Sequence, residues 1–186
     1  MFIDYLALDL VNLVIALVLV AVFFVFYVEK DQQKVGPGLL ATGSIASISG
    51  LEMIFAWPLH GSYNIAFGEP MVLFGVLLFF TGLAVIKGWD LLTLGIFSVF
   101  AGLVAIVVGI RMMNLKMTSA PTLAGLAYIL TGVGGMLAFP AYLLRKNMVP
   151  RIVVAALLIV AAVLFALTGY GSYWGHLASF AKWAPK

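Results

Sequence analysis

The sequence contains very little charge and no cysteine. Of its 186 residues only 9% are charged and 65% are hydrophobic, whereas about 25% of the residues in a soluble domain are charged. Such a chain cannot cover itself with polar groups in water, so a lipid bilayer must be its solvent. The absence of cysteine excludes disulfides, thiolate metal sites, iron–sulfur clusters and cysteine nucleophiles.

The sequence also lacks the motifs of common enzymes. No Walker loop, dinucleotide fingerprint, HExxH or GxSxG is present, which favours a protein that is not an enzyme. The net charge of +3 is scattered over the loops, so lipid headgroups explain it better than nucleic acid. The beginning, MFIDYLALDL, has neither the basic region nor the cleavage site of a signal peptide, so we expect the first helix to be retained.

Long apolar runs separated by short polar segments predict an all-α fold. A run of about 20 apolar residues spans the hydrocarbon core, which is about 30 Å thick. The chain has room for six such helices in one transmembrane domain covering residues 1–186. The expected helices are 7–28, 38–59, 70–86, 90–110, 121–144 and 151–168, followed by an interfacial tail over 169–186.

Lysine and arginine are unevenly divided between the two ends of this bundle. Six lie on the side of the first, third and fifth connections: Lys30, Lys34, Lys87, Arg145, Lys146 and Arg151. Four lie on the other side: Arg111, Lys116, Lys182 and Lys186. Because basic residues favour the cytoplasmic side, we expect both termini on the extracytoplasmic side.

Glycines recur at intervals of seven residues in the four middle helices. The series are Gly36, Gly43 and Gly50; Gly68, Gly75 and Gly82; Gly88, Gly95, Gly102 and Gly109; and Gly125 and Gly132. Seven residues return a helix to nearly the same face, so each series predicts a seam of close helix contact. Residues 7–28 and 151–168 contain no glycine, so we expect these two helices to lie outside an inner bundle of the other four.

Polar residues gather at the predicted outer end. The candidate binding residues there are Glu52, His60, Tyr63, Asn64, Glu69, Arg111, Tyr173 and His176. Glu52 lies inside an apolar run, where an ionisable residue suggests function. It could be protonated and hydrogen-bonded to Ser49, paired with Arg111 as a structural lock, or bound to a proton or cation.

Two histidines make a metal site conceivable. His60 and His176, with Glu52 or Glu69, would supply nitrogen and oxygen ligands suited to zinc, copper or iron. No HxxxH or HxH pair supports this set, and haem is a weaker alternative because both histidines lie at predicted helix ends.

Other polar and aromatic residues have structural interpretations. Tryptophans and tyrosines near the outer end, among them Trp57, Tyr170 and Trp174, are typical of an interfacial belt. Leu177, Phe180 and Trp183 recur at helical spacing and predict a short interfacial helix. We interpret Asp90 as a helix cap, and Asn12 as an interhelical hydrogen-bonding residue.

Three segments carry a resemblance to a known family. WPLHGSYNIAFGEP, FGVLLFFTGLAVIKGWDLL and GYGSYWGHLASFAKW together resemble a family of small multi-pass membrane proteins of archaea and bacteria, known as a domain of unknown function. The resemblance implies a single domain in a prokaryotic cell membrane and no particular activity.

Three hypotheses for function remain open. The first is a binding or transport protein with an outward-facing polar site for a proton, a metal ion or a small solute. The second is a non-catalytic accessory subunit that scaffolds a larger membrane complex. The partners expected of the chain are the lipid bilayer and either further copies of itself in a homo-oligomer or the subunits of such a complex. The third is a membrane redox protein with haem or metal.

Overall fold

Six long helices make up the part of the protein that the structure describes. The computed structural model describes residues 4–183, and each helix is long and apolar enough to cross a membrane. Their bounds are α1 Tyr5–Val22, α2 Gly36–Ala56, α3 Glu69–Lys87, α4 Leu92–Asn114, α5 Pro121–Leu143 and α6 Met148–Ser179. No strand occurs within residues 4–183. The all-α membrane bundle predicted from the sequence is therefore confirmed.

Two helices include a π-helical turn. The last turn of α1 widens into the π-helix η1 (Phe23–Tyr27), and α3 is preceded by the π-helix η3 (Asn64–Gly68). A short 3₁₀ segment, η2 (Gln32–Val35), leads into α2. Single π turns inside helices are frequent at functional sites.

Local chemistry at the helix ends explains where the helices begin and end. The Asp4 side chain accepts a hydrogen bond from the Ala7 N–H at 3.3 Å and so caps α1. The Asn147 side chain caps α6 through the N–H of Val149 at 3.0 Å. At the end of α3, Gly88 adopts a φ of 70°, which glycine tolerates without steric cost. Asp90 accepts from the Leu92 N–H at 2.7 Å just before α4, as a capping residue does.

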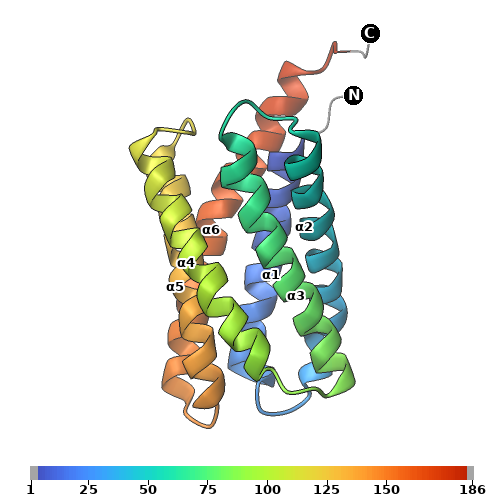
Figure 1. Cartoon of the computed structure of the whole chain (residues 1–186), viewed down its shortest axis with the longest axis vertical. Coiled ribbons are helices and arrows are strands. Elements are labelled where there is room, and N and C mark those ends of the chain that lie inside the picture. The colour runs from blue at the N-terminus through green and yellow to red at the C-terminus, as the bar shows by residue number, and fades with distance from the viewer. Residues whose placement is uncertain (1–3, 184–186) are drawn as a thin grey trace.

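The helices form a closed ring of three antiparallel pairs. The most extensive contacts are α1 with α6, α2 with α3, and α4 with α5, and α5 also packs on α6 (Figure 1). Because α1 lies beside α6, the first helix closes the ring against the last. The prediction that α1 and α6 lie outside an inner bundle is wrong.

The glycine seams lie face to face within two of these pairs. A Cβ placed on Gly43 of α2 would come within 2.8 Å of the Gly75 carbonyl oxygen of α3. In the α4–α5 pair, a Cβ on Gly109 would come within 2.7 Å of the Gly125 carbonyl oxygen. Only glycine permits this approach of two backbones, so the predicted seams are confirmed as contacts inside the protein, except at Gly88, which lies just beyond the end of α3 and has nothing within 4 Å of an added Cβ.

Alanine takes the place of glycine in the α1–α6 pair. Ala16, Ala21, Ala161 and Ala162 are at most 3% exposed. In the apolar 18-residue stretch taken from each helix, 39% of the residues of α1 and of α6 are buried, against 17% of those of α4. A methyl group is small enough for close transmembrane packing, and for this reason the lack of glycine did not place these helices outside.

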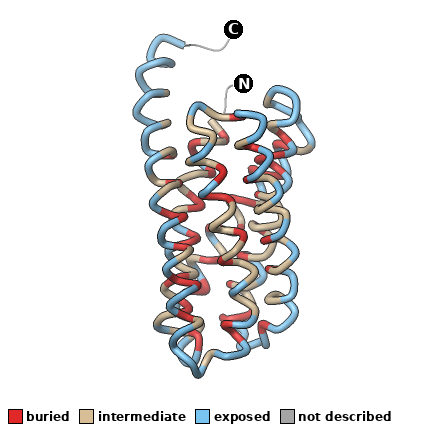
Figure 2. The backbone as a smooth tube through the Cα atoms, turned by 90° about the vertical axis from the view of Figure 1, so that its left-hand side faces the viewer, coloured by how far each residue is buried: buried red, intermediate tan, exposed pale blue. Residues whose placement is uncertain are grey.

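The sixth helix extends beyond the rest of the bundle. It ends at Ser179 rather than at Thr168, and its last turns are exposed where they project past the other helices (Figure 2). Most of the predicted interfacial tail is therefore a continuation of α6, and residues 184–186, including Lys186, lie outside the described residues. The start of α1 and the end of α6 lie at the same end of the bundle (Figure 1).

Candidate functional site

Two cavities occupy the centre of the ring. The first has a volume of about 100 Å³ and the second about 60 Å³. All six helices contribute to the wall of the first cavity, through residues such as Leu17, Leu39, Thr81, Ser98, Gly135 and Leu158. The two cavities share five lining residues, Phe74, Leu77, Ser98, Thr131 and Gly135, and so adjoin one another. Each exceeds the roughly 10–15 Å³ that one water molecule requires.

One face of α5 follows both cavities along their length. Tyr128, Thr131, Gly135, Ala138 and Tyr142 recur at intervals of three and four residues, and each lines at least one cavity. The two tyrosines stand at the two extremes of this face, about 21 Å apart at 1.5 Å per residue. Gly135, the smallest residue of this face, lines both cavities and so lies at their junction.

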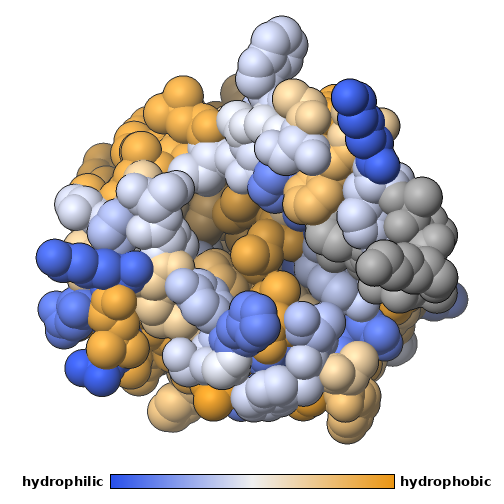
Figure 3. Space-filling model, turned by 90° about the horizontal axis from the view of Figure 1, so that it is seen from above, coloured by the Kyte–Doolittle hydropathy of each residue, from blue (hydrophilic) through white to orange (hydrophobic). Residues whose placement is uncertain are grey.

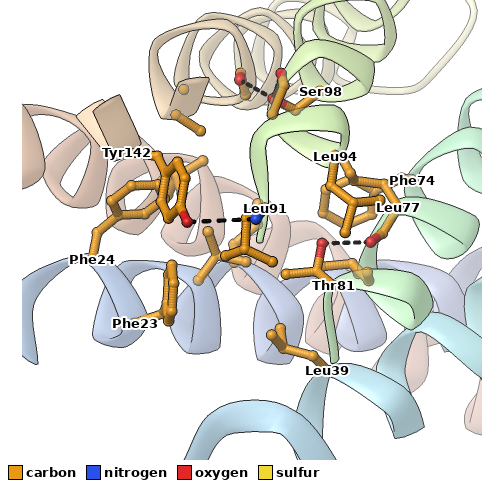
Figure 4. A pocket seen from close by; sticks show the side chains of 18 of the residues that line it. Phe23, Phe24, Leu39, Phe74, Leu77, Thr81, Leu91, Leu94, Ser98 and Tyr142 are labelled. Carbon is orange, nitrogen blue, oxygen red and sulfur yellow. Dashed lines mark hydrogen bonds between the residues drawn. The ribbon is translucent and has the colours of Figure 1, made fainter. Parts of the chain in front are cut away.

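The cavity walls are uncharged, with hydroxyl groups among apolar side chains. The Ser98 hydroxyl lies within hydrogen-bonding distance of the carbonyls of Gly95 (2.7 Å) and Gly135 (2.9 Å). The Thr81 hydroxyl donates to its own helix at Leu77 (Figure 4), and the Thr131 hydroxyl donates to Ala127 at 2.8 Å. Their protons are taken by backbone carbonyls, so the hydroxyl oxygens are left to accept hydrogen bonds from a molecule in the cavity.

Aromatic side chains bound the first cavity near the end of α1. The Tyr142 hydroxyl donates to Asp90 at 3.2 Å and accepts from the Leu91 N–H at 3.4 Å (Figure 4). Phe23 and Phe24 of the π-helix η1 line the same cavity and pack edge to face, with ring centroids 5.4 Å apart.

A second set of aromatic rings bounds the other cavity toward the opposite end. Tyr63 stacks on Phe67 of the π-helix η3 at 6.1 Å, Phe67 meets Tyr128 at 6.4 Å, and Tyr128 meets Phe165 at 5.7 Å. Tyr128 and Phe165 line the second cavity. Seen from this end, the molecule is hollowed near its middle, with apolar side chains at the bottom of the hollow (Figure 3). Each π-helix thus supplies aromatic rings at one end of the two cavities.

The residues predicted as an outer polar site lie toward one end of the bundle, and within residues 4–183 no side-chain hydrogen bond or ion pair joins any two of them. Glu52, His60, Glu69, Arg111 and Tyr173 are all exposed. Glu52 accepts a hydrogen bond from the Tyr5 hydroxyl at 3.4 Å. It forms no ion pair with Arg111, since the ion pairs of residues 4–183 are Lys34–Asp31, Arg151–Glu29 and His176–Asp4.

The remaining predicted residues have structural partners. Asn64 is fully buried in the connection before α3. Its side chain accepts a hydrogen bond from the Leu59 N–H at 3.0 Å and donates one to the Leu59 carbonyl at 2.6 Å, which stabilises this connection. Tyr63 belongs to the aromatic set described above. His176 pairs through Nδ1 with Asp4, which joins the extension of α6 to the start of α1.

The described residues contain no cluster of three or more His, Asp and Glu side chains that could hold a metal ion. Glu52, His60 and His176 are therefore not assembled into the predicted ligand set. The expectation failed because spacing along the chain does not determine which way a side chain at a helix end points.

Three buried polar residues lie outside the set predicted as a binding site. Asp9 is 2% exposed and lies within hydrogen-bonding distance (2.6 Å) of the Ser49 hydroxyl, the partner suggested for Glu52. Asn12 is 3% exposed and donates to the Thr42 carbonyl at 2.9 Å, which is the interhelical role expected of it. Arg151, counted as a loop charge, is 7% exposed. The sequence did contain one sign of this polar interface: the spacing of Asp9 and Asn12 places both on one face of a helix.

Comparisons with known proteins place these features in a family and a fold. The profile of a family described as a protein of unknown function (DUF981) matches residues 1–179. A search among curated proteins gives no match. Among solved structures, the chain is similar to the urea channel from the human gastric pathogen Helicobacter pylori, with a TM-score of 0.69 and 16% sequence identity over 96% of this chain and 99% of that one. At this identity, the likeness shows a shared fold of membrane helices.

Proposed function

Since the chain belongs to the DUF981 family of proteins of unknown function, its function must be argued from its structure, and we propose that it passes a small uncharged solute across the membrane through the centre of the helix ring. The observation that carries this proposal is the pair of adjoining central cavities, with a wall drawn from all six helices. A space at the centre of a closed ring is shielded from lipid on every side, and a polar molecule crossing a bilayer needs this shielding.

The chemistry of the wall favours an uncharged solute over an ion. No charged side chain lines either cavity, and a charge inside a membrane costs several kcal/mol without a partner. The hydroxyl oxygens of Thr81, Ser98 and Thr131 are available to accept hydrogen bonds from N–H or O–H groups. Urea, named for the channel of similar fold, is of this chemical kind and is the first solute to test.

We also propose an orientation and a location. Arg151 is buried against backbone carbonyls, so it is discounted as a loop charge. The remaining basic residues at its end, Lys30, Lys34, Lys87, Arg145 and Lys146, still favour the cytoplasmic side, which leaves the start of α1 outside. The family resemblance and the bacterial source of the similar channel support a prokaryotic cell membrane.

The proposal is tested by solute flux in reconstituted liposomes. The purified protein is inserted into vesicles, and the swelling that follows a urea or glycerol gradient is recorded by stopped-flow light scattering. We expect faster entry of at least one small neutral solute than into protein-free vesicles, without added conductance for sodium or chloride. Equal rates with and without protein for every neutral solute tested would contradict the proposal.

A matched pair of glycine variants links any flux to the cavities. Gly135 lies at their junction, and a Cβ added there would meet its nearest neighbour, the Ser98 carbonyl oxygen, at an ordinary 3.5 Å. Gly135→Leu should therefore fold while filling the junction, and flux should fall to the level of empty vesicles. Gly171 in the exposed extension of α6 has nothing within 4 Å of an added Cβ, so Gly171→Leu should leave the flux unchanged.

A further inference from the structure

The interface between α1 and α2 carries three levels of polar contacts, apart from the central cavities. Nearest the end where α1 begins, the Tyr5 hydroxyl donates to Glu52 at 3.4 Å. About one turn deeper, Asp9 Oδ1 lies 2.6 Å from the Ser49 hydroxyl, and below it Asn12 Nδ2 donates to the Thr42 carbonyl at 2.9 Å. The spacing of Tyr5, Asp9 and Asn12 places all three on one face of α1.

Two oxygen atoms at the deeper levels have no partner. Asp9 Oδ2 and Asn12 Oδ1 are both buried and form no hydrogen bond, and their residues are only 2% and 3% exposed. The orientation of the Asn12 amide is fixed because the Thr42 carbonyl can only accept, so its nitrogen must face α2. The free atoms are therefore a carboxyl oxygen and an amide carbonyl oxygen, and buried polar atoms of this kind are nearly always satisfied in proteins.

Asp9 also lacks a cationic partner. The basic side chains that form ion pairs within residues 4–183 contact other carboxylates: Lys34 contacts Asp31, Arg151 contacts Glu29 and His176 contacts Asp4. The other polar and titratable groups around Asp9 are Ser49 of α2, Tyr128 of α5, which is close enough to interact electrostatically, and the Tyr5–Glu52 pair one turn away. All of these are neutral or negative, so a carboxylate at this depth calls for a positive charge.

We propose that Asp9 and Asn12 bind one exchangeable monovalent cation, a proton or a sodium ion, between α1 and α2. Carboxylate, amide carbonyl and hydroxyl oxygens are the ligands that hard cations prefer. Glu52, exposed at the outer level, would attract the cation toward the interface, while Asp9 would hold it. Neither Asp9 nor Asn12 lines the central cavities, and the proposed site does not depend on solute flux.

Infrared difference spectroscopy of the intact protein tests the site directly. Spectra are recorded for a pH step in choline buffer, and for replacement of choline by sodium at constant pH. We expect a protonated-carboxyl band that is lost in Asp9→Asn and retained in the matched variant Glu52→Gln. Loss of the band on adding sodium identifies a sodium site, whereas loss only on raising the pH identifies a proton site.

Ser49→Ala tests the assignment of the infrared band to Asp9 a second time, without removing the Asp9 carboxyl. Removing the hydroxyl should shift the frequency of the Asp9 band and change the midpoint of the sodium or pH response by about tenfold in concentration, which corresponds to the loss of one favourable contact. An Asp9 band that responds to neither sodium nor pH would overturn the proposal, as would its absence under all conditions. A band that Ser49→Ala leaves unshifted in frequency and midpoint would also overturn it.

Discussion

The side-chain Nε of Arg151 in α6 donates a hydrogen bond of 2.7 Å to the backbone carbonyl oxygen of Phe24 in the π-helix η1. The same guanidinium donates to the Val25 carbonyl at 2.6 Å and to the Arg145 carbonyl at 3.1 Å, and it pairs with Glu29. The last carbonyls of a helix have no partner within the helix, so Arg151 satisfies those at the π-helical end of α1. This arrangement holds Phe24 and its neighbour Phe23 in the wall of the first cavity.

We predict that Arg151→Leu lowers the free energy of unfolding by about 2–3 kcal/mol, because it leaves buried carbonyls without donors. Arg151→Lys should lose less, since an ammonium keeps the charge but cannot reach several carbonyls at once. Thermal unfolding in detergent measures both. Lys146→Leu, at an exposed position, is the control, and equal stability of Arg151→Leu and this control would contradict the prediction.

The glycine contacts between α2 and α3 give a second prediction. In Gly43→Ala the new methyl group would lie 2.8 Å from the Gly75 carbonyl oxygen, and backbone cannot move aside as a flexible side chain can. The two helices must separate, at a cost of about 1–3 kcal/mol. Gly171→Ala, in open space, should be neutral or more stable by up to about 1 kcal/mol through helix propensity. Thermal unfolding that gives both variants the same stability would argue against the seam.

The sequence was most informative where the chemistry permits a single residue type. Only glycine allows backbones to approach as closely as Gly43 and Gly75 do, so the seams could be predicted from spacing. Close packing through alanine could not be predicted in this way, because alanine is equally common on helix faces that contact lipid. For this reason the position of α1 beside α6 was missed.

The rotation of each helix was the main unknown for the candidate site. In a membrane protein both the core and the lipid-facing surface are apolar, so hydropathy does not distinguish them. Glu52 and Asp9 both lie within apolar runs, yet the first is exposed and the second is buried. Likewise, the sequence around Arg151 gives no sign of the two carbonyls that it contacts on η1, which are 127 and 126 residues away along the chain.

Removing a hydroxyl from the cavity wall should change which solutes pass. Thr131 lines both cavities, and valine has nearly the same shape without the oxygen. We predict that Thr131→Val lowers the permeability to urea or glycerol about fivefold, as expected for the loss of one hydrogen bond of about 1 kcal/mol. The comparison is Thr168→Val, which removes a hydroxyl bonded within α6 away from both cavities. Stopped-flow rates that fall equally in the two variants would show that the effect is not specific to the wall.

The contact between His176 and Asp4 should hold the extension of α6 against the rest of the protein. Beyond the bundle, Gly171 and Gly175 have no neighbour within 4 Å of an added Cβ, and Trp174 is 86% exposed, so few other contacts restrain this part of the helix. We predict that His176→Ala raises amide hydrogen exchange in residues 170–179 about fivefold, since partly exposed pairs contribute at most about 1 kcal/mol. Exchange in the centres of α2 and α3 should not change. Trp174→Ala, which removes a larger side chain without touching Asp4, should leave exchange at the wild-type rate. If it raises exchange as much as His176→Ala does, the Asp4 contact is not what restrains the extension, because alanine itself favours the helix in both variants.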